Sequence, residues 1–165
     1  MPNQSRVADQ SGFTLVDGLL ASVLVGVGLL ALAAMQGISL ARNVDANELT
    51  RVTNLTSDII ERIQFNRQNV TEYNGVNTTA TTPCPSSMGT MARGDCLQWK
   101  SMLEASEAKL ASVQGTVSVT AEGPTSPALN QQRVTVTVSW MGSVNSGSTT
   151  KRSRRVTLET VIAPE

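Results

Sequence analysis

The strongest pattern in the chain is an apolar run near its beginning. Residues 18–41 carry no charged side chain, and 17 of these 24 residues are apolar. A helix of this length would extend about 36 Å, enough to cross a bilayer core of roughly 30 Å. Farther on, apolar residues fall on one helical face at Val44, Val52, Leu55, Ile59 and Ile63. We therefore expect one long helix over 13–67, with a membrane-spanning half (13–41) and an amphipathic half (42–67).

The chain changes character after the expected helix. Residues 68–94 are rich in Asn, Thr and Pro, which predicts an irregular loop. Asp95 has the features of a helix N-cap, with Gln98 as its capping-box partner, so we expect a short helix over about 96–112. Trp99 is expected either to pack on the globular part of the chain after the long helix or to lie at its surface. The apolar contacts expected from this helix are Leu97, Met102, Leu103 and Leu110.

Three later segments alternate between apolar and polar residues, which is typical of strands with one buried face. Their alternating positions begin at Val117, Val134 and Val156. The connectors are short, so the strands predict an antiparallel meander of three or four strands that covers the amphipathic half of the helix. Residues 68–165 would then form the head of an α+β protein, in which a long N-terminal helix packs against a small antiparallel sheet.

Composition and charge limit the chemistry that this fold could carry. The chain has 13 Lys and Arg, 13 Asp and Glu, two Cys and no His. Balanced charge argues against a general nucleic-acid binder, and the lack of His excludes Ser–His and Cys–His pairs and a structural zinc site. No phosphate-binding Gly-x-x-x-x-Gly-Lys run appears. We expect no catalysis, no cofactor, no metal and no small-molecule substrate.

Two further features of the head have alternative interpretations. Cys84 and Cys96 are the only cysteines and follow the apolar run, so an oxidising compartment would favour a disulfide over two free thiols. Closing a loop of this length would contribute about 3 kcal/mol. The basic cluster Lys151–Arg155 could contact nucleic acid, an anionic surface or another subunit, or it could be a solvated strand edge.

Three interpretations fit the apolar run itself. A cleaved secretory signal could end at the A-x-A site Ala31–Ala33, and a plain signal anchor would explain the length alone. The third uses the order of residues before the run. A polar leader of residues 1–12 ends in Gly12, Phe13 begins an apolar segment, and Asp17 is the one acid that interrupts it.

This third pattern resembles the N-terminus of type IV pilins and pseudopilins. The resemblance implies that a prepilin peptidase cuts after Gly12 and that the new amine of Phe13 is methylated. It also implies that Asp17, at the fifth mature position, pairs with the amine of a neighbouring subunit and sets the assembly register. The family mostly carries Glu there, and Asp is one methylene shorter. The alternative is that Asp17 is an ordinary acid near a helix N-terminus at the headgroup boundary.

Two stretches narrow the resemblance to PilV-type minor pilins, namely residues 28–36 and 58–67. The resemblance implies an inner-membrane protein with a periplasmic head that later joins a cell-surface pilus. Its partners would be the prepilin peptidase, the major pilin, other minor pilins with which it primes assembly, and a tip adhesin. A type II secretion pseudopilin and a membrane-anchored periplasmic binding module that never polymerises are the alternatives.

Overall fold

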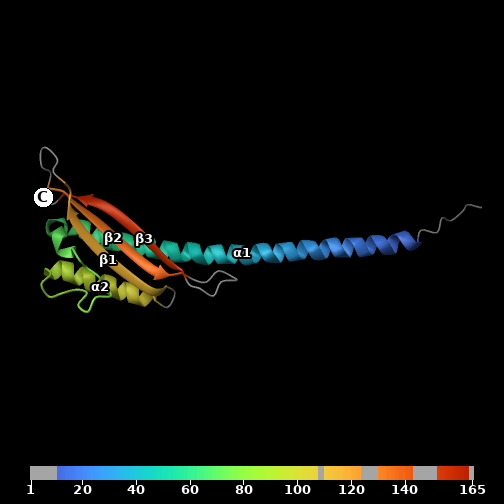
Figure 1. The fold of residues 1–165 in the computed structure, drawn as a ribbon, viewed down its shortest axis with the longest axis horizontal. Helices are drawn as coiled ribbons and strands as arrows, with labels where there is room; N and C mark the ends of the chain where they lie inside the picture. The colour runs from blue at the N-terminus through green and yellow to red at the C-terminus, as the bar shows by residue number, and fades with distance from the viewer. Residues whose placement is uncertain (1–10, 108–109, 124–129, 143–151, 164–165) are drawn as a thin grey trace, which may run out of the picture. The chain divides into compact units, whose positions relative to one another are not determined.

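The computed structural model describes residues 11–107, 110–123, 130–142 and 152–163 (Figure 1). The chain divides into two compact units, Met1–Arg42 and Asn43–Glu165. The elements in chain order are α1 (Ser11–Phe65), the 3-10 helix η1 (Arg67–Tyr73), α2 (Thr90–Ser106), β1 (Ala111–Ala121), β2 (Gln132–Met141) and β3 (Ser153–Ile162).

The first unit consists of helix α1 up to Arg42. From Leu15 to Leu40 every side-chain position is exposed except Gly26, which is half-buried. An added Cβ at Gly18, Gly26, Gly28 or Gly37 would meet nothing within 4 Å. This half of α1 therefore builds no core with the other described residues, although it is strongly apolar.

The second unit begins with the remainder of α1, whose buried face is regular. Val52, Thr56, Ile59 and Ile63 are at most 1% exposed and follow one another by steps of four, three and four residues. The hydroxyl of Thr56 donates to the carbonyl oxygen of Val52 at 2.7 Å, so its burial leaves no polar group unpaired. The prediction for Val44 is wrong, because its side chain is 49% exposed and Glu48 occupies the buried face instead.

Helix α2 differs in position from the predicted helix over 96–112. It begins at Thr90 with Gly89 as N-cap and ends at Ser106, so Asp95 is not a cap but lies inside the helix. Of the predicted contacts, Leu103 and Leu110 are buried and Met102 packs against the core, whereas Leu97 is exposed. Leu110 lies beyond the end of the helix, directly before β1.

Trp99 fills the space between α2, α1 and the sheet. It is fully buried, and its indole N–H donates to the carbonyl oxygen of Leu55 at 2.8 Å. A Cβ added at Gly115 of β1 would lie 2.3 Å from the indole ring, so glycine is required where the ring crosses the strand. Of the two placements expected for Trp99, the structure has the packed one.

The sheet is the predicted antiparallel meander, with strand order β1-β2-β3. The β2–β3 pairing runs without interruption from Gln132 opposite Ile162 to Met141 opposite Ser153. Strand β1 starts six residues before the predicted Val117, and its register shifts between Ala111 and Gln114. Ser112 has a φ of 52° at this shift, a conformation that L-residues rarely adopt outside bulges and turns.

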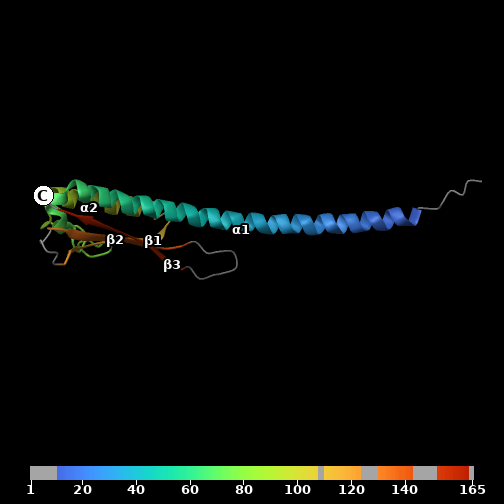
Figure 2. The same cartoon turned by 90° about the horizontal axis from the view of Figure 1, so that it is seen from above.

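The two faces of the sheet differ in chemistry. The inward face carries the buried residues Val113, Val117, Val119, Val134, Val136, Val138 and Trp140. Helix α2 and the end of α1 lie on this face, as Figure 2 shows from above. The outward face is polar, with the hydroxyls of Thr137 and Thr157 3.0 Å apart across β2 and β3. The head is therefore a two-layer α+β unit with one core.

The segment 68–94 is more ordered than a plain loop. Its first residues form η1, and its last five begin α2. Between them, residues 74–78 run beside β1 and form an isolated bridge from Asn77 to Thr116. Gly75 turns the chain into this path with a φ of 79°.

Candidate functional site

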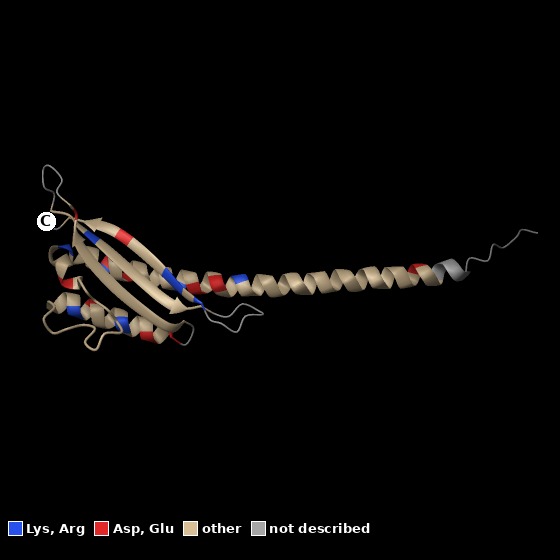
Figure 3. Cartoon of the chain, in the orientation of Figure 1, with Lys and Arg blue, Asp and Glu red and all other residues tan. Residues whose placement is uncertain are grey.

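The apolar half of α1 is the first candidate site. One helix in the described part of the chain is long and apolar enough to cross a membrane. Its mean hydropathy reaches 2.4 over an 18-residue window of which nothing is buried. Figure 3 shows one acidic position near the start of this half of α1, followed by a long stretch without charged residues. Such a surface is compatible with a single-pass anchor, because lipid tails supply the apolar surroundings that the chain does not.

Asp17 is the one acid in the apolar half of α1 and directly precedes the uncharged residues 18–41. It is the seventh residue of α1, its side chain is exposed, and α1 has no acid in its first turn. The helix dipole acts mainly within the first turn, so it gives Asp17 little stabilisation in a helix that starts at Ser11. A chain cut after Gly12 would begin at Phe13 and place Asp17 at its fifth residue.

The other residues of the predicted processing site lie at the start of α1. Gly12 and Phe13 lie in the first turn of α1. The other leader residues, 1–10, lie outside the described residues, and so does Lys151 of the basic cluster.

A buried acid and an indole meet where α1 enters the head. Glu48 is only 6% exposed, and its Oε2 accepts a hydrogen bond from Trp140 Nε1 at 3.1 Å. Strand β3 supplies Arg154, whose Nη2 donates to Asp45 Oδ2 at 3.1 Å and whose Nη1 lies 4.0 Å from Glu48 Oε2. These bonds join α1 to two strands that are more than 90 residues farther along the chain, so they attach the helix to the sheet.

This attachment divides the predicted basic cluster. The hydrogen bond to Asp45 raises the pKa of the Arg154 guanidinium, which stays charged. A Cβ added at Gly142 would lie 2.5 Å from Arg154 Nε, so the guanidinium group crosses the strand end at a glycine. Arg152 and Arg155 are exposed. Arg154 is thus an internal partner of α1, and its two described neighbours face solvent.

A second polar network joins the end of α1 to α2. Arg62 Nε donates to Asp58 Oδ2 at 2.7 Å, and Arg62 Nη1 donates to Gln98 Oε1 at 2.7 Å and lies 3.4 Å from Asp95 Oδ1. The hydrogen bond to Asp58 raises the pKa of Arg62. Asp95 and Gln98 share one face of α2 because they are three residues apart. The residues predicted as a capping box therefore bind an arginine of another helix.

The same network continues to Tyr73 of η1. The phenol donates to Asp95 Oδ2 at 2.6 Å and accepts from Asn66 Nδ2 at 3.1 Å. Burial raises the pKa of Tyr73, and the hydrogen bond to the Asp95 carboxylate raises it further, because both favour the neutral phenol. Asp58, Arg62 and Asn66, which belong to the stretch 58–67, have structural roles here. Phe65 from that stretch is 83% exposed and takes no part in the core.

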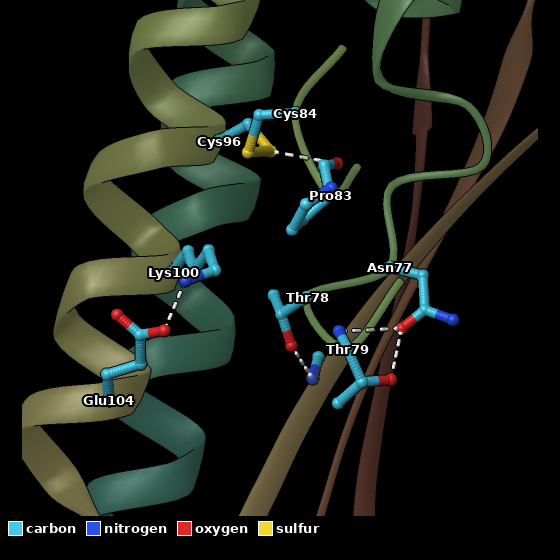
Figure 4. Close-up of a disulfide and its surroundings, with 9 residues drawn as sticks. Asn77, Thr78, Thr79, Pro83, Cys84, Cys96, Lys100 and Glu104 are labelled. Carbon is cyan, nitrogen blue, oxygen red and sulfur yellow. Dashed lines mark hydrogen bonds and ion pairs between the residues drawn. A yellow bond between two sulfur atoms is a disulfide. The ribbon is translucent and has the colours of Figure 1, made fainter. Parts of the chain in front are cut away.

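The disulfide is formed as predicted. Cys84 and Cys96 are bonded with Cα atoms 5.8 Å apart, and the chain has no free cysteine. Figure 4 shows the bond joining the loop before α2 to the first half of α2, next to the carbonyl group of Pro83. Both cysteines are buried. The bond therefore links the loop that follows residues 74–78 to helix α2.

Comparison with known proteins adds no relative. No protein-family model, curated protein or solved structure matches the chain. Among the described residues, no group of three or more His, Cys, Asp or Glu side chains could hold a metal ion. The sequence pattern does not predict the pairing of Asp45 and Glu48 with Arg154 and Trp140. The one available signal was the i, i+3 spacing of two acids on the apolar side of a helix.

Proposed function

We propose that the chain is a type IV pilin-like subunit of the PilV-type minor pilins. A prepilin peptidase cuts it after Gly12, the amine of Phe13 is methylated, and α1 holds it in the inner membrane with the head in the periplasm. It then enters a cell-surface pilus through the apolar half of α1. There it contacts the major pilin and other minor pilins, helps to prime assembly and presents a tip adhesin.

One observation carries this proposal. The apolar half of α1 is exposed from Leu15 to Leu40 and holds a single acid, Asp17, four residues after the expected new terminus. A plain anchor needs the apolar surface but no acid, since a carboxylate at mid-bilayer costs about 2.5–3.5 kcal/mol on insertion scales. A subunit that packs its helix among the helices of other subunits uses both, because the acid can pair with a neighbour's amine.

The glycines of α1 support helix packing in an assembly. Each weakens an isolated helix by roughly 1 kcal/mol relative to alanine. Among the described residues, no contact requires a glycine at positions 18, 26, 28 or 37. Small residues let neighbouring helices approach closely in lipid or in a filament core. An assembled helix bundle therefore gives Gly26 and Gly28 a role that the single chain does not.

The experiment that tests the proposal replaces Asp17. Asp17→Ala is expected to insert into the membrane normally and to be lost from purified pili, because the ion pair to the neighbouring subunit is missing. Asp17→Glu, which restores the residue usual in the family, is the matched control and is expected to incorporate as well as the natural chain. Immunoblots of membrane and sheared-pilus fractions give both readouts.

Each outcome of this experiment assigns the chain to a class. Equal incorporation of the alanine and natural chains would remove the assembly role of Asp17. A chain that stays in the membrane and never enters a filament would favour the membrane-anchored binding module. Incorporation only into the filament of a type II secretion system would favour a pseudopilin, which shares the same helix design.

A further inference from the structure

The two edge strands of the sheet, β1 and β3, differ in whether their outward backbone groups have hydrogen-bond partners. On the β1 edge, Gly75 N donates to Val117 O at 3.1 Å, Val117 N to Val76 O at 2.9 Å, and Thr78 N to Gly115 O at 2.9 Å. Side chains complete the cover, since Gly115 N donates to Thr78 Oγ1 and Val119 N to Asn74 Oδ1. The outward backbone groups of central β1 are therefore satisfied by residues 74–78.

The β3 edge has no such cover from the described residues. Gly142 N donates to Arg152 O, which identifies residues of even number in β3 as those that exchange hydrogen bonds with β2. Alternation in an antiparallel ladder then turns the N–H and C=O groups of Arg155, Thr157, Glu159 and Val161 away from β2. No backbone hydrogen bond links these groups to another part of the described chain.

Strand β3 also lacks most features that protect an edge. It has ten residues, contains no proline, and pairs with β2 without a bulge. Its core-facing Val156 and Leu158 are only half-buried, and Val161 on the other face is 47% exposed. A strand added at this edge would gain backbone hydrogen bonds and would cover this apolar surface.

Charge indicates the chemistry of the added strand. Glu159 accepts hydrogen bonds from Arg133 Nη1 at 3.2 Å and from Thr135 Oγ1 at 3.3 Å, so its charge is compensated within the sheet. Arg155 and Arg152 are exposed at the other end of the edge, and no carboxylate among the described residues forms an ion pair with either. The edge is therefore positive at its N-terminal end.

We propose that the β3 edge binds an extended segment of another protein, which adds as a fourth strand and places carboxylates opposite Arg155 and Arg152. This surface goes beyond the proposed pilus function, because it requires neither cleavage nor polymerisation. A second copy of this chain is the alternative occupant, and the measurements below distinguish it.

Hydrogen exchange on the full chain in detergent micelles tests the proposal with defined peptides. The probe is a synthetic peptide of alternating Thr and Val whose two Glu residues fall opposite Arg155 and Arg152 in an antiparallel register. A second peptide has Lys at those two positions. In the free protein, the amides of Arg155, Thr157, Glu159 and Val161 are expected to exchange quickly and that of Val117 slowly. The Glu peptide at ten times its Kd should slow the four β3 amides about tenfold.

Variants at the edge separate strand addition from charge attraction. Thr157→Pro removes an outward N–H that β2 does not use, so the fold tolerates it, and binding should weaken on the order of tenfold. Thr157→Ala keeps that N–H and is the matched control, expected to bind like the natural chain. Arg155→Glu should reverse the preference between the Glu and Lys peptides.

Three results would overturn the proposal. The first is slow exchange of the four β3 amides in the free monomer, which would mean that the edge is already covered. The second is equal binding by the proline and alanine variants, or equal affinity for the Glu and Lys peptides. The third is concentration-dependent dimerisation that protects β3 without peptide, which would make a second copy the occupant. None of these results depends on whether the chain enters a pilus.

Discussion

Helix α1 contains two regions that differ in whether their apolar side chains are buried within the chain. From Leu15 to Leu40 its apolar side chains are exposed, and its one acid, Asp17, lies among them without an ion pair to another described residue. From Asn43 onward one apolar face of the helix, with Val52, Ile59 and Ile63, is buried. On that part of the helix the acids Asp45 and Glu48 bind Arg154 and Trp140 of the head. The difference indicates that the region from Asn43 onward finds its packing partners in the head. The region from Leu15 to Leu40 finds them in its surroundings, such as lipid or other subunits.

The comparison separates stability from assembly. Substitutions in the buried region of α1 should change the free energy of unfolding of the head. Substitutions in the exposed region should leave that energy unchanged and act on membrane insertion or on contacts with other subunits. Both tryptophans of the chain, Trp99 and Trp140, are buried in the head, so their fluorescence reports head unfolding alone.

The largest effect is expected from truncating matched aliphatic residues in the two regions. Ile59→Ala leaves a cavity under the sheet and should lower the free energy of unfolding by about 2–5 kcal/mol. Leu24→Ala, at a position 72% exposed, should leave it unchanged. Denaturant unfolding followed by tryptophan fluorescence measures both. Comparable losses at Leu24 and Ile59 would mean that the two regions are not distinct.

Removal of the disulfide should have the next largest effect. Replacing Cys84 and Cys96 together by Ser should lower the free energy of unfolding by about 3 kcal/mol, because the unfolded chain gains loop freedom. Reduction of the natural chain with dithiothreitol is the control and should reproduce the loss, while the double variant should not respond to the reductant. A loss below about 0.5 kcal/mol would show that the loop is held by its other contacts.

A smaller effect is expected at the junction of α1 and the sheet. Arg154→Ala leaves the carboxylates of Asp45 and Glu48 without their guanidinium partner and should cost about 1–2 kcal/mol, given the partial exposure of the site. Arg155→Ala is the neighbouring control and should stay within about 0.5 kcal/mol. Thermal unfolding of the two variants measures the difference, and equal Tm values would refute the internal role of Arg154.

The smallest effect concerns pH. Because the pKa of Tyr73 is raised by folding, its contribution to stability is complete below pH about 10 and is lost as the pH rises further. Tyr73 is the only tyrosine, so phenolate absorbance reports its ionisation directly. Ionisation of the folded chain at the pH of free tyrosine would contradict the network of Asn66, Tyr73 and Asp95. Tyr73→Phe should remove this part of the pH dependence.

Local pattern was enough to predict the main elements of the fold. The helix expected over 13–67 is α1, Ser11–Phe65, and the three alternating segments are the antiparallel strands. The hydrophobic period and the length of a helix or strand depend on residues that are neighbours in the chain. Both can therefore be read from a single sequence. The pairing of Cys84 with Cys96 followed because no other cysteine competes. Asp17 is marked in the sequence by the absence of charge around it.

Long-range pairing explains what local pattern could not predict. Glu48 replaces Val44 on the buried face of α1 because Trp140, 92 residues away, donates a hydrogen bond to it. Asp95 and Gln98 have the spacing of a capping box, but they bind Arg62, which is more than 30 residues earlier in the chain. Local rules assign acids to caps and solvent because they cannot include partners of this kind.

The measurement that tests the central claim most directly is the mass of the N-terminal peptide of the native protein. The proposal that α1 is an assembly helix predicts a chain beginning at Phe13 with a methylated amine, so that Asp17 is its fifth residue. A chain beginning at Met1 would contradict processing of the pilin type and favour a plain anchor. A chain beginning at Ala34 would contradict it as well, because the apolar half of α1 would then be a discarded secretory signal.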